Sequence, residues 1–180
     1  QLADVKDDYL DPKLVQRTQE QLTAKQEKIG YYNDKISATA SQVEAMEMSR
    51  NLKLNSLDNK LEQLRRKVTS DSAELVAAEI DHGIAVQQLS RAKQMFSEGI
   101  IALTEFEHRT AQYNKALALL TEKQQKFQNT KQDITICRIE MSTVRQDAAD
   151  KIFKAQGDIA SARGEVASTD VEVAKNQNQL

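Results

Sequence analysis

The 180-residue chain has no tryptophan, one proline, one cysteine, five glycines and four phenylalanines. A β-sandwich or barrel needs many tight turns, which glycine and proline supply, so this scarcity excludes those folds. A lone cysteine excludes a scaffold held by internal disulfides. No apolar run approaches the roughly 20 residues that a membrane-spanning helix needs.

Charged residues are abundant, yet the two signs nearly cancel. Lys and Arg number 25 against 27 Asp and Glu, and hydrophobic residues make up 39%, below the roughly 45–50% of ordinary globular domains. A net charge of -2 is too small for a typical disordered chain and too negative for a nucleic-acid scaffold. The composition predicts a long polar helical protein with a narrow apolar seam and no large core.

Two residues indicate where helices begin and end. Pro12, preceded by Asp11, suits the first position of a helix because its missing N–H needs no partner there. Gly99 suits the left-handed conformation that often ends a helix. We therefore predict four segments: an extended lead-in (1–11), an ascending helical arm (12–97), a tip turn (98–102) and a descending helical arm (103–180). The stretch 69–72 could break the ascending arm, but the heptad keeps its phase there, which favours a continuous or slightly kinked helix.

Apolar residues recur every seven positions in both arms, which is typical of a left-handed coiled coil. Folding the chain at Gly99 places small residues of the ascending arm opposite large ones of the descending arm, as interdigitating side chains require. The predicted fold is all-α, a long antiparallel two-helix coiled-coil hairpin. In this register Asp71 is expected near Lys131. The ascending rows are Leu22, Ile29, Ile36, Val43, Arg50, Leu57, Leu64, Asp71, Ala78, Ala85 and Ala92, with Leu61, Val68, Leu75, His82, Leu89 and Phe96 beside them. The descending rows are Phe106, Tyr113, Leu120, Phe127, Ile134, Met141, Ala148, Ala155 and Ala162, with Leu103, Thr110, Leu117, Gln124, Lys131, Arg138, Arg145, Ile152, Ile159, Val166, Val173 and Leu180 beside them.

The chain lacks the motifs of catalysis. His82 and His108 have no ligand partner at helical spacing, so we expect no metal site. Cys137 is expected on the helix surface or its flank. There is no phosphate-binding glycine loop and no nucleophile motif, so we predict a non-enzyme without a cofactor.

Two apolar features do not belong to the seam. Ile100, Ile101 and Leu103 cluster at the predicted tip, which indicates either a contact site or a plug that closes the end of the coiled coil. Val76, Ile80 and Ile84 step by four beside the seam. They indicate either a contact with a neighbouring hairpin or ordinary scatter of exposed apolar residues.

Around the predicted turn, Arg91 is followed by Met95 four residues on and by Ala102 seven further. This spacing resembles the tip motif of periplasmic adaptors, or membrane fusion proteins, of the HlyD type, which is Arg, then Leu four residues on, then Ser or Thr seven further. Met95 keeps the apolar bulk of that motif, whereas Ala102 loses the hydroxyl. The flanking KLEQLRRKV and the alanine-rich heptads are also similar to the family.

The resemblance implies a function in export. Such adaptors bridge an inner-membrane transporter, here with an ABC-type transporter favoured, to a TolC-like outer-membrane channel, commonly as a hexamer. It implies that the tip contacts the channel through Arg91, Met95, Gly99, Ile100 and Ala102. It also implies a periplasmic protein anchored to the inner membrane, with lipoyl-like halves around the hairpin, of which 1–11 would end the first. The alternative is a structural coiled-coil spacer, or an arm of a cytoskeletal or chromosome-organising protein.

Overall fold

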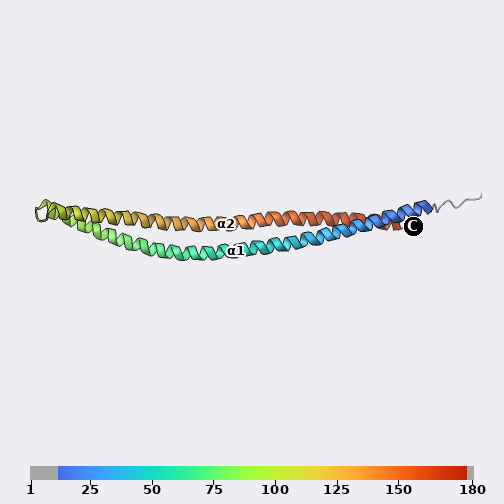
Figure 1. Cartoon of the computed structure of the whole chain (residues 1–180), viewed down its shortest axis with the longest axis horizontal. Coiled ribbons are helices and arrows are strands. Elements are labelled where there is room, and N and C mark those ends of the chain that lie inside the picture. Colours follow the sequence, from blue (N-terminus) through green and yellow to red (C-terminus); the bar gives the residue numbers. More distant parts are fainter. Residues whose placement is uncertain (1–11, 178–180) are drawn as a thin grey trace, which may run out of the picture. The chain divides into compact units, whose positions relative to one another are not determined.

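The computed structural model describes residues 12–177, which form two long helices and one turn. Helix α1 spans Pro12–Ser97 and helix α2 spans Leu103–Gln177, and no strand occurs between these limits. The helices run antiparallel and pack together (Figure 1), which confirms the predicted all-α helical hairpin. The predicted lead-in over 1–11 and the last residues of the descending arm, 178–180, lie outside the described residues.

Helix α1 continues through 69–72 without interruption. The stretch contains Thr69, whose hydroxyl donates to the carbonyl of Arg65 in the preceding turn at 3.2 Å. Because the acceptor belongs to the preceding turn of the same helix, this hydrogen bond does not favour a non-helical backbone conformation. The constant heptad phase on either side keeps one face of the helix against α2.

The contacts divide the chain into two units. We call Lys53–Val144 the tip unit, and the described residues 12–52 and 145–177 the terminal unit. In the tip unit, the ascending rows predicted from the sequence are buried or half-buried, apart from Phe96 beside the turn. Small residues are among the most buried there, with Ala78, Ala85 and Ala92 at 3%, 9% and 6% exposure. Small side chains let the two backbones approach closely.

The terminal unit is also built on two heptad rows from each helix. On α2 the most buried residues are Ile152, Ala155, Ala162 and Thr169. On α1 every seam residue is only half-buried: Leu22, Lys25, Ile29, Tyr32, Ile36, Thr39, Val43, Met46 and Arg50. The four apolar residues predicted there, Leu22, Ile29, Ile36 and Val43, thus contact the partner helix as expected.

One predicted row of the descending arm is wrong. Between the turn and residue 145, only Thr110 of this row is half-buried, whereas Leu103, Leu117, Gln124, Lys131, Arg138 and Arg145 are exposed. The row that packs lies one residue earlier in each heptad: Arg109, Ala116, Lys123, Thr130, Cys137 and Val144. These residues are small, or they bury an aliphatic stem and keep a charged head in water, so they fit against α1.

The prediction for Cys137 is also wrong. Its side chain is completely buried in the tip unit, at 0% exposure. The thiol donates to the backbone carbonyl of Leu57 across the seam, with Sγ 3.4 Å from the oxygen. Free cysteine behaves as a small hydrophobic residue with a weak donor, which suits a position where two helices approach closely.

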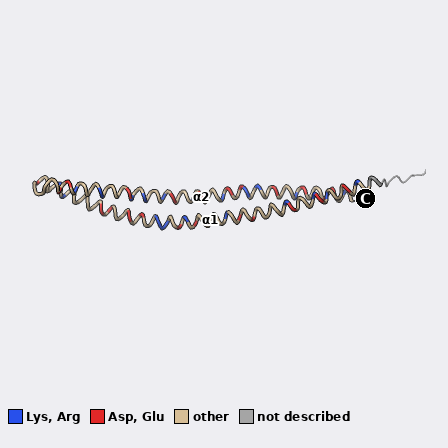
Figure 2. The backbone as a smooth tube through the Cα atoms, in the orientation of Figure 1, with Lys and Arg blue, Asp and Glu red and all other residues tan. Residues whose placement is uncertain are grey.

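Positive and negative residues are interspersed along both helices (Figure 2). Some of them pair across the seam: Lys60 with Glu140 in the tip unit at 3.1 Å, and Lys25 with Glu172 in the terminal unit at 3.3 Å. Such exposed pairs add little stability each.

Candidate partner-binding tip

The turn between the helices is a Schellman motif, which reverses the chain in very few residues. The Ile100 N–H donates to the Met95 carbonyl at 2.8 Å, and the Gly99 N–H donates to the Phe96 carbonyl at 3.0 Å. Gly99 has a φ of 73°, a conformation that costs a residue with a Cβ atom about 1–2 kcal/mol. The bonds satisfy carbonyls at the end of α1 that would otherwise lack partners.

Helix α2 starts without a side-chain cap. The Ala102 carbonyl accepts the first helical bond, from Phe106 N–H at 3.3 Å, and a second from Glu105 N–H at 3.1 Å. Ala102 is therefore the N-cap residue, and alanine has no oxygen to accept the free N–H groups of the first turn. Those donors face solvent or a partner. The position at which this chain has Ala102 in place of a hydroxyl residue is thus the helix cap.

The sides of the tip expose apolar surface. Phe96 and Phe106 stack with ring centroids 5.2 Å apart and close the end of the seam. Around this plug, Ile100 is 61% exposed, Leu103 53% and Met95 39%. The plug and an exposed apolar surface thus coexist, so closing the coiled coil does not account for all the apolar residues of the tip.

A groove of about 260 Å³ runs along one side of the tip. It brings together two of the predicted contact residues, Arg91 and Met95, with residues from the turn and from α2. Gly99, Ile100 and Ala102 lie in the turn itself and do not line it. The full lining is Gln88, Arg91, Ala92, Met95, Ile101, Glu105 and Arg109.

The two arginines of this groove differ in their partners. Arg109 donates from Nε to Glu105 Oε1 at 2.8 Å, and from Nη1 to the side-chain oxygens of Gln88 and Gln112 at 3.3 Å each. Arg91 is exposed and has no hydrogen bond or ion pair with any residue of 12–177. A guanidinium without an internal partner is available to an acceptor on another molecule.

Val76, Ile80 and Ile84, the predicted contact with a neighbouring hairpin, lie outside the buried rows of α1. They are exposed by 50%, 58% and 50%. The spacing of four places them on one face of the helix. The result is an exposed apolar stripe along the tip unit.

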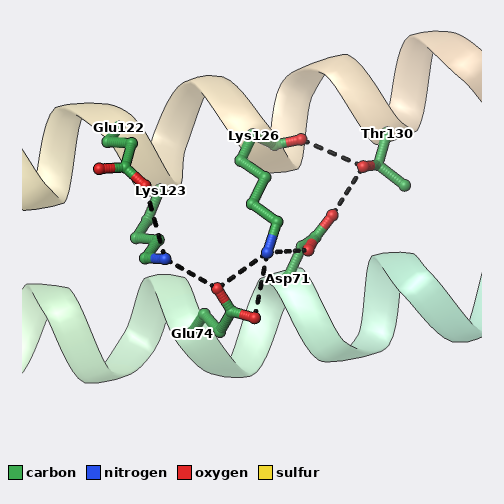
Figure 3. A network of polar contacts seen from close by, with 6 residues as sticks. All are labelled: Asp71, Glu74, Glu122, Lys123, Lys126 and Thr130. Atoms are coloured by element: carbon green, nitrogen blue, oxygen red, sulfur yellow. Dashed lines mark hydrogen bonds and ion pairs between the residues drawn. The ribbon is translucent and has the colours of Figure 1, made fainter.

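A buried polar network crosses the seam of the tip unit (Figure 3). Asp71 on α1 is 2% exposed and Thr130 on α2 is 1% exposed. The Thr130 hydroxyl donates to Asp71 Oδ2 at 2.6 Å, and Lys126 Nζ lies 3.1 Å from Asp71 Oδ1. Asp71 therefore pairs with Thr130 and Lys126, and the expected neighbour Lys131 instead lies exposed with its ammonium over the Phe127 ring.

The network extends to solvent through Glu74. Lys126 and Lys123 both donate to its carboxylate at about 3.0 Å, and Glu122 pairs with Lys123 at 3.6 Å. The Thr130 hydrogen bond, helped by Lys126, holds the pKa of Asp71 below its ordinary value although burial opposes the shift. The two lysines lower the pKa of Glu74 in the same way. The carboxylates are thus stabilised in their charged forms, which indicates a structural network.

Neither histidine belongs to this polar network. The His82 ring lies 5.5 Å from the Tyr113 ring, between centroids, and its Nε2 is buried without a hydrogen-bond partner. His108 Nε2 lies 2.9 Å from the Gln112 amide nitrogen. Within residues 12–177, no group of three or more His, Cys, Asp or Glu side chains is arranged to hold a metal ion.

Sequence reasoning missed two parts of this picture. It did not place Glu105 and Arg109 in the tip groove, although a Glu four residues before an Arg in a first helical turn is a recognisable pair. It also missed Thr130 as the partner of Asp71, because it assigned the buried row one residue too late. A threonine at heptad spacing from Lys123 and Cys137 was the available signal.

Comparisons with known proteins bear on the fold. No family model matches the chain, and no curated protein sequence matches it. Over the described residues, neither helix is long and apolar enough to cross a membrane. A solved structure of the periplasmic adaptor protein EmrA is similar, with a TM-score of 0.71 and 17% sequence identity. The match covers 95% of this chain and 51% of that one, so the chain spans about half the length of the protein whose helical fold it shares.

Proposed function

We propose that the chain is the helical hairpin of a periplasmic adaptor of the HlyD type, which contacts a TolC-like outer-membrane channel through its tip during export. The observation that carries the proposal is the likeness to EmrA over nearly the whole hairpin, at a TM-score of 0.71. The tip adds support, because an unpaired Arg91 beside an exposed Met95 offers a charged donor and an apolar contact together. Gly99, Ile100 and Ala102 form the turn that enters the channel contact.

In this proposal the adaptor works in the periplasm, anchored to the inner membrane and joined to an inner-membrane transporter, with the ABC type favoured. Six copies surround the exported substrate. The exposed stripe of Val76, Ile80 and Ile84 is the contact between neighbouring hairpins, since an apolar stripe on a polar helix gains free energy when a second copy covers it. The hairpin itself performs no catalysis and carries no cofactor.

The tip contact is tested with Arg91→Asp and Ala102→Asp in the full-length protein. We expect both to reduce export and site-specific crosslinking to the outer-membrane channel. Glu107→Gln is the matched control, because Glu107 is exposed close to the turn but lies outside the groove. Wild-type export and crosslinking in both Asp variants would favour the alternative, a coiled-coil spacer.

The hairpin contact is tested separately with cysteine at position 80 in a Cys137→Ser background. We expect crosslinks between copies of the assembled protein in cells. Cysteine in place of Phe153, which is more exposed than Ile80 at 79% and lies in the terminal unit, reports whether crosslinking is specific to the stripe. Equal crosslinking at both positions would contradict the assignment of the stripe as a contact between neighbouring hairpins.

A further inference from the structure

Only part of the charge in the groove beside the tip is free to pair with another molecule. Three charged residues line it: Arg91 from α1, and Glu105 and Arg109 from α2. Ala92, Met95 and Ile101 supply the apolar part of the lining. A carboxylate and two guanidinium groups in one small groove can pair in more than one way, and the choice determines which charge stays free.

The observed pairing holds Glu105 on its own helix. Arg109 Nε donates to Glu105 Oε1 at 2.8 Å across one helical turn, which is the favourable order of an acidic and a basic residue on a helix. The contacts of Arg109 with Gln88 and Gln112 fix its guanidinium further. Glu105 also lies in the first turn of α2, where the helix dipole favours a negative charge.

Arg91 remains without a partner in this arrangement. Both groups line the same groove, yet no ion pair joins Arg91 to Glu105 or to any other residue described. If Arg109 were absent, Glu105 would be the carboxylate of the groove without a counter-ion. An internal pair between Arg91 and Glu105 would then compete with any external acceptor.

We propose that Arg109 is a positioning residue that holds Glu105 and thereby keeps the Arg91 guanidinium free for the partner. The inference rests on the proposed function of the tip and adds which partner segments the tip selects. The free charge is positive and lies beside Met95 and Ile101, so the groove takes a protein segment that presents a carboxylate or free backbone carbonyls next to an apolar side chain. A segment with a basic residue at that place is rejected.

The experiment compares four variants of the full-length protein for binding to the purified outer-membrane channel: Arg91→Gln, Arg109→Gln, Arg109→Gln with Glu105→Gln, and Arg109→Gln with Glu107→Gln. Arg91→Gln is expected to weaken binding about tenfold or more, the usual effect of losing a hydrogen bond to a charged group. Arg109→Gln is expected to weaken it several-fold. The Glu105→Gln double variant restores binding, whereas the Glu107→Gln double variant, which removes the same charge outside the groove, does not.

A second measurement follows Arg91 without the channel. Nuclear magnetic resonance of the Arg91 Nε–H group should show slowed solvent exchange in Arg109→Gln and a return to wild-type exchange in the Glu105→Gln double variant. Unchanged exchange in Arg109→Gln, or failure of Glu105→Gln to rescue binding, overturns the role of Arg109. Wild-type channel binding by Arg91→Gln instead overturns the proposed function of the tip, while the exchange measurement still decides the pairing.

Discussion

Replacing Thr130 with valine should destabilise the hairpin although it changes almost no volume. Thr130 is 1% exposed and its hydroxyl donates to the carboxylate of Asp71, itself 2% exposed, at 2.6 Å. Valine has a similar shape but no donor, so Oδ2 of a buried carboxylate loses its partner. A hydrogen bond to a charged group contributes about 1.5–3 kcal/mol. We expect the free energy of unfolding to fall by about that amount.

Urea unfolding followed by circular dichroism at pH 7 measures this change. The matched control is Thr169→Val, because Thr169 is similarly buried, at 3% exposure. Its hydroxyl donates only to the carbonyl of Glu165 in its own helix, at 2.8 Å. That carbonyl also accepts a helical bond, and a hydroxyl bonded to the preceding turn does not stabilise a helix, so we expect the control to destabilise the hairpin much less than Thr130→Val.

The effect of Thr130→Val should depend on pH. The hydrogen bond lowers the pKa of Asp71 in the folded state from its ordinary 3.8, so its stabilisation is complete above about pH 4 and is lost as pH falls through the folded pKa. The difference between wild type and variant should therefore be constant from pH 7 to about pH 5 and shrink below about pH 4. Equal effects of Thr130→Val and Thr169→Val, or a difference that does not shrink as pH falls below about 4, would refute the reasoning.

Three further changes test the tip and the seam. Ala102→Ser gives α2 a side-chain cap and should raise the free energy of unfolding by about 0.5–2 kcal/mol; no gain would mean that Ala102 is not the N-cap. Gly99→Ala should lower the free energy of unfolding by about 1–2 kcal/mol because φ is 73° at this position. Gly83→Ala, inside α1 with open space around the added Cβ, should instead raise it by roughly 1 kcal/mol. Equal effects of the two substitutions would contradict the turn geometry. Cys137, at 0% exposure, should react with a thiol reagent slowly in buffer and rapidly in urea, and fast labelling of the folded chain would contradict its burial.

The sequence was sufficient to predict the hairpin and most of its seam, for a physical reason. A strict repeat of seven fixes one row of each helix, and the register then follows from the single Gly99 turn. The second row is ambiguous, since positions three or four residues after the first row both lie near the partner helix. The heptad repeat predicts Lys131 and Arg138 in it, whereas the small residues one position earlier, Thr130 and Cys137, pack there.

The tip was harder to predict because its chemistry depends on how side chains pair. The sequence indicates that Arg91 and Met95 lie near the turn, but it does not show that they share a groove with Glu105 and Arg109. The structure pairs the Glu105 carboxylate with Arg109, whose Nε lies 2.8 Å from Glu105 Oε1, and not with Arg91. Heptad periodicity does not contain that information.

The Asp71–Thr130 pair and the Gly99 turn together set a rule for changing the length of the tip unit. Four heptads of α1 separate Asp71 from Gly99, and four heptads of α2 separate Ala102 from Thr130. Deleting one heptad from a single helix would displace Asp71 from Thr130 by about 10 Å, since each residue advances the helix by 1.5 Å. Deleting one heptad from both helices keeps the pair and the turn intact. Insertions and deletions between these two points should therefore be tolerated only as matched heptads, in natural relatives and in engineered hairpins alike.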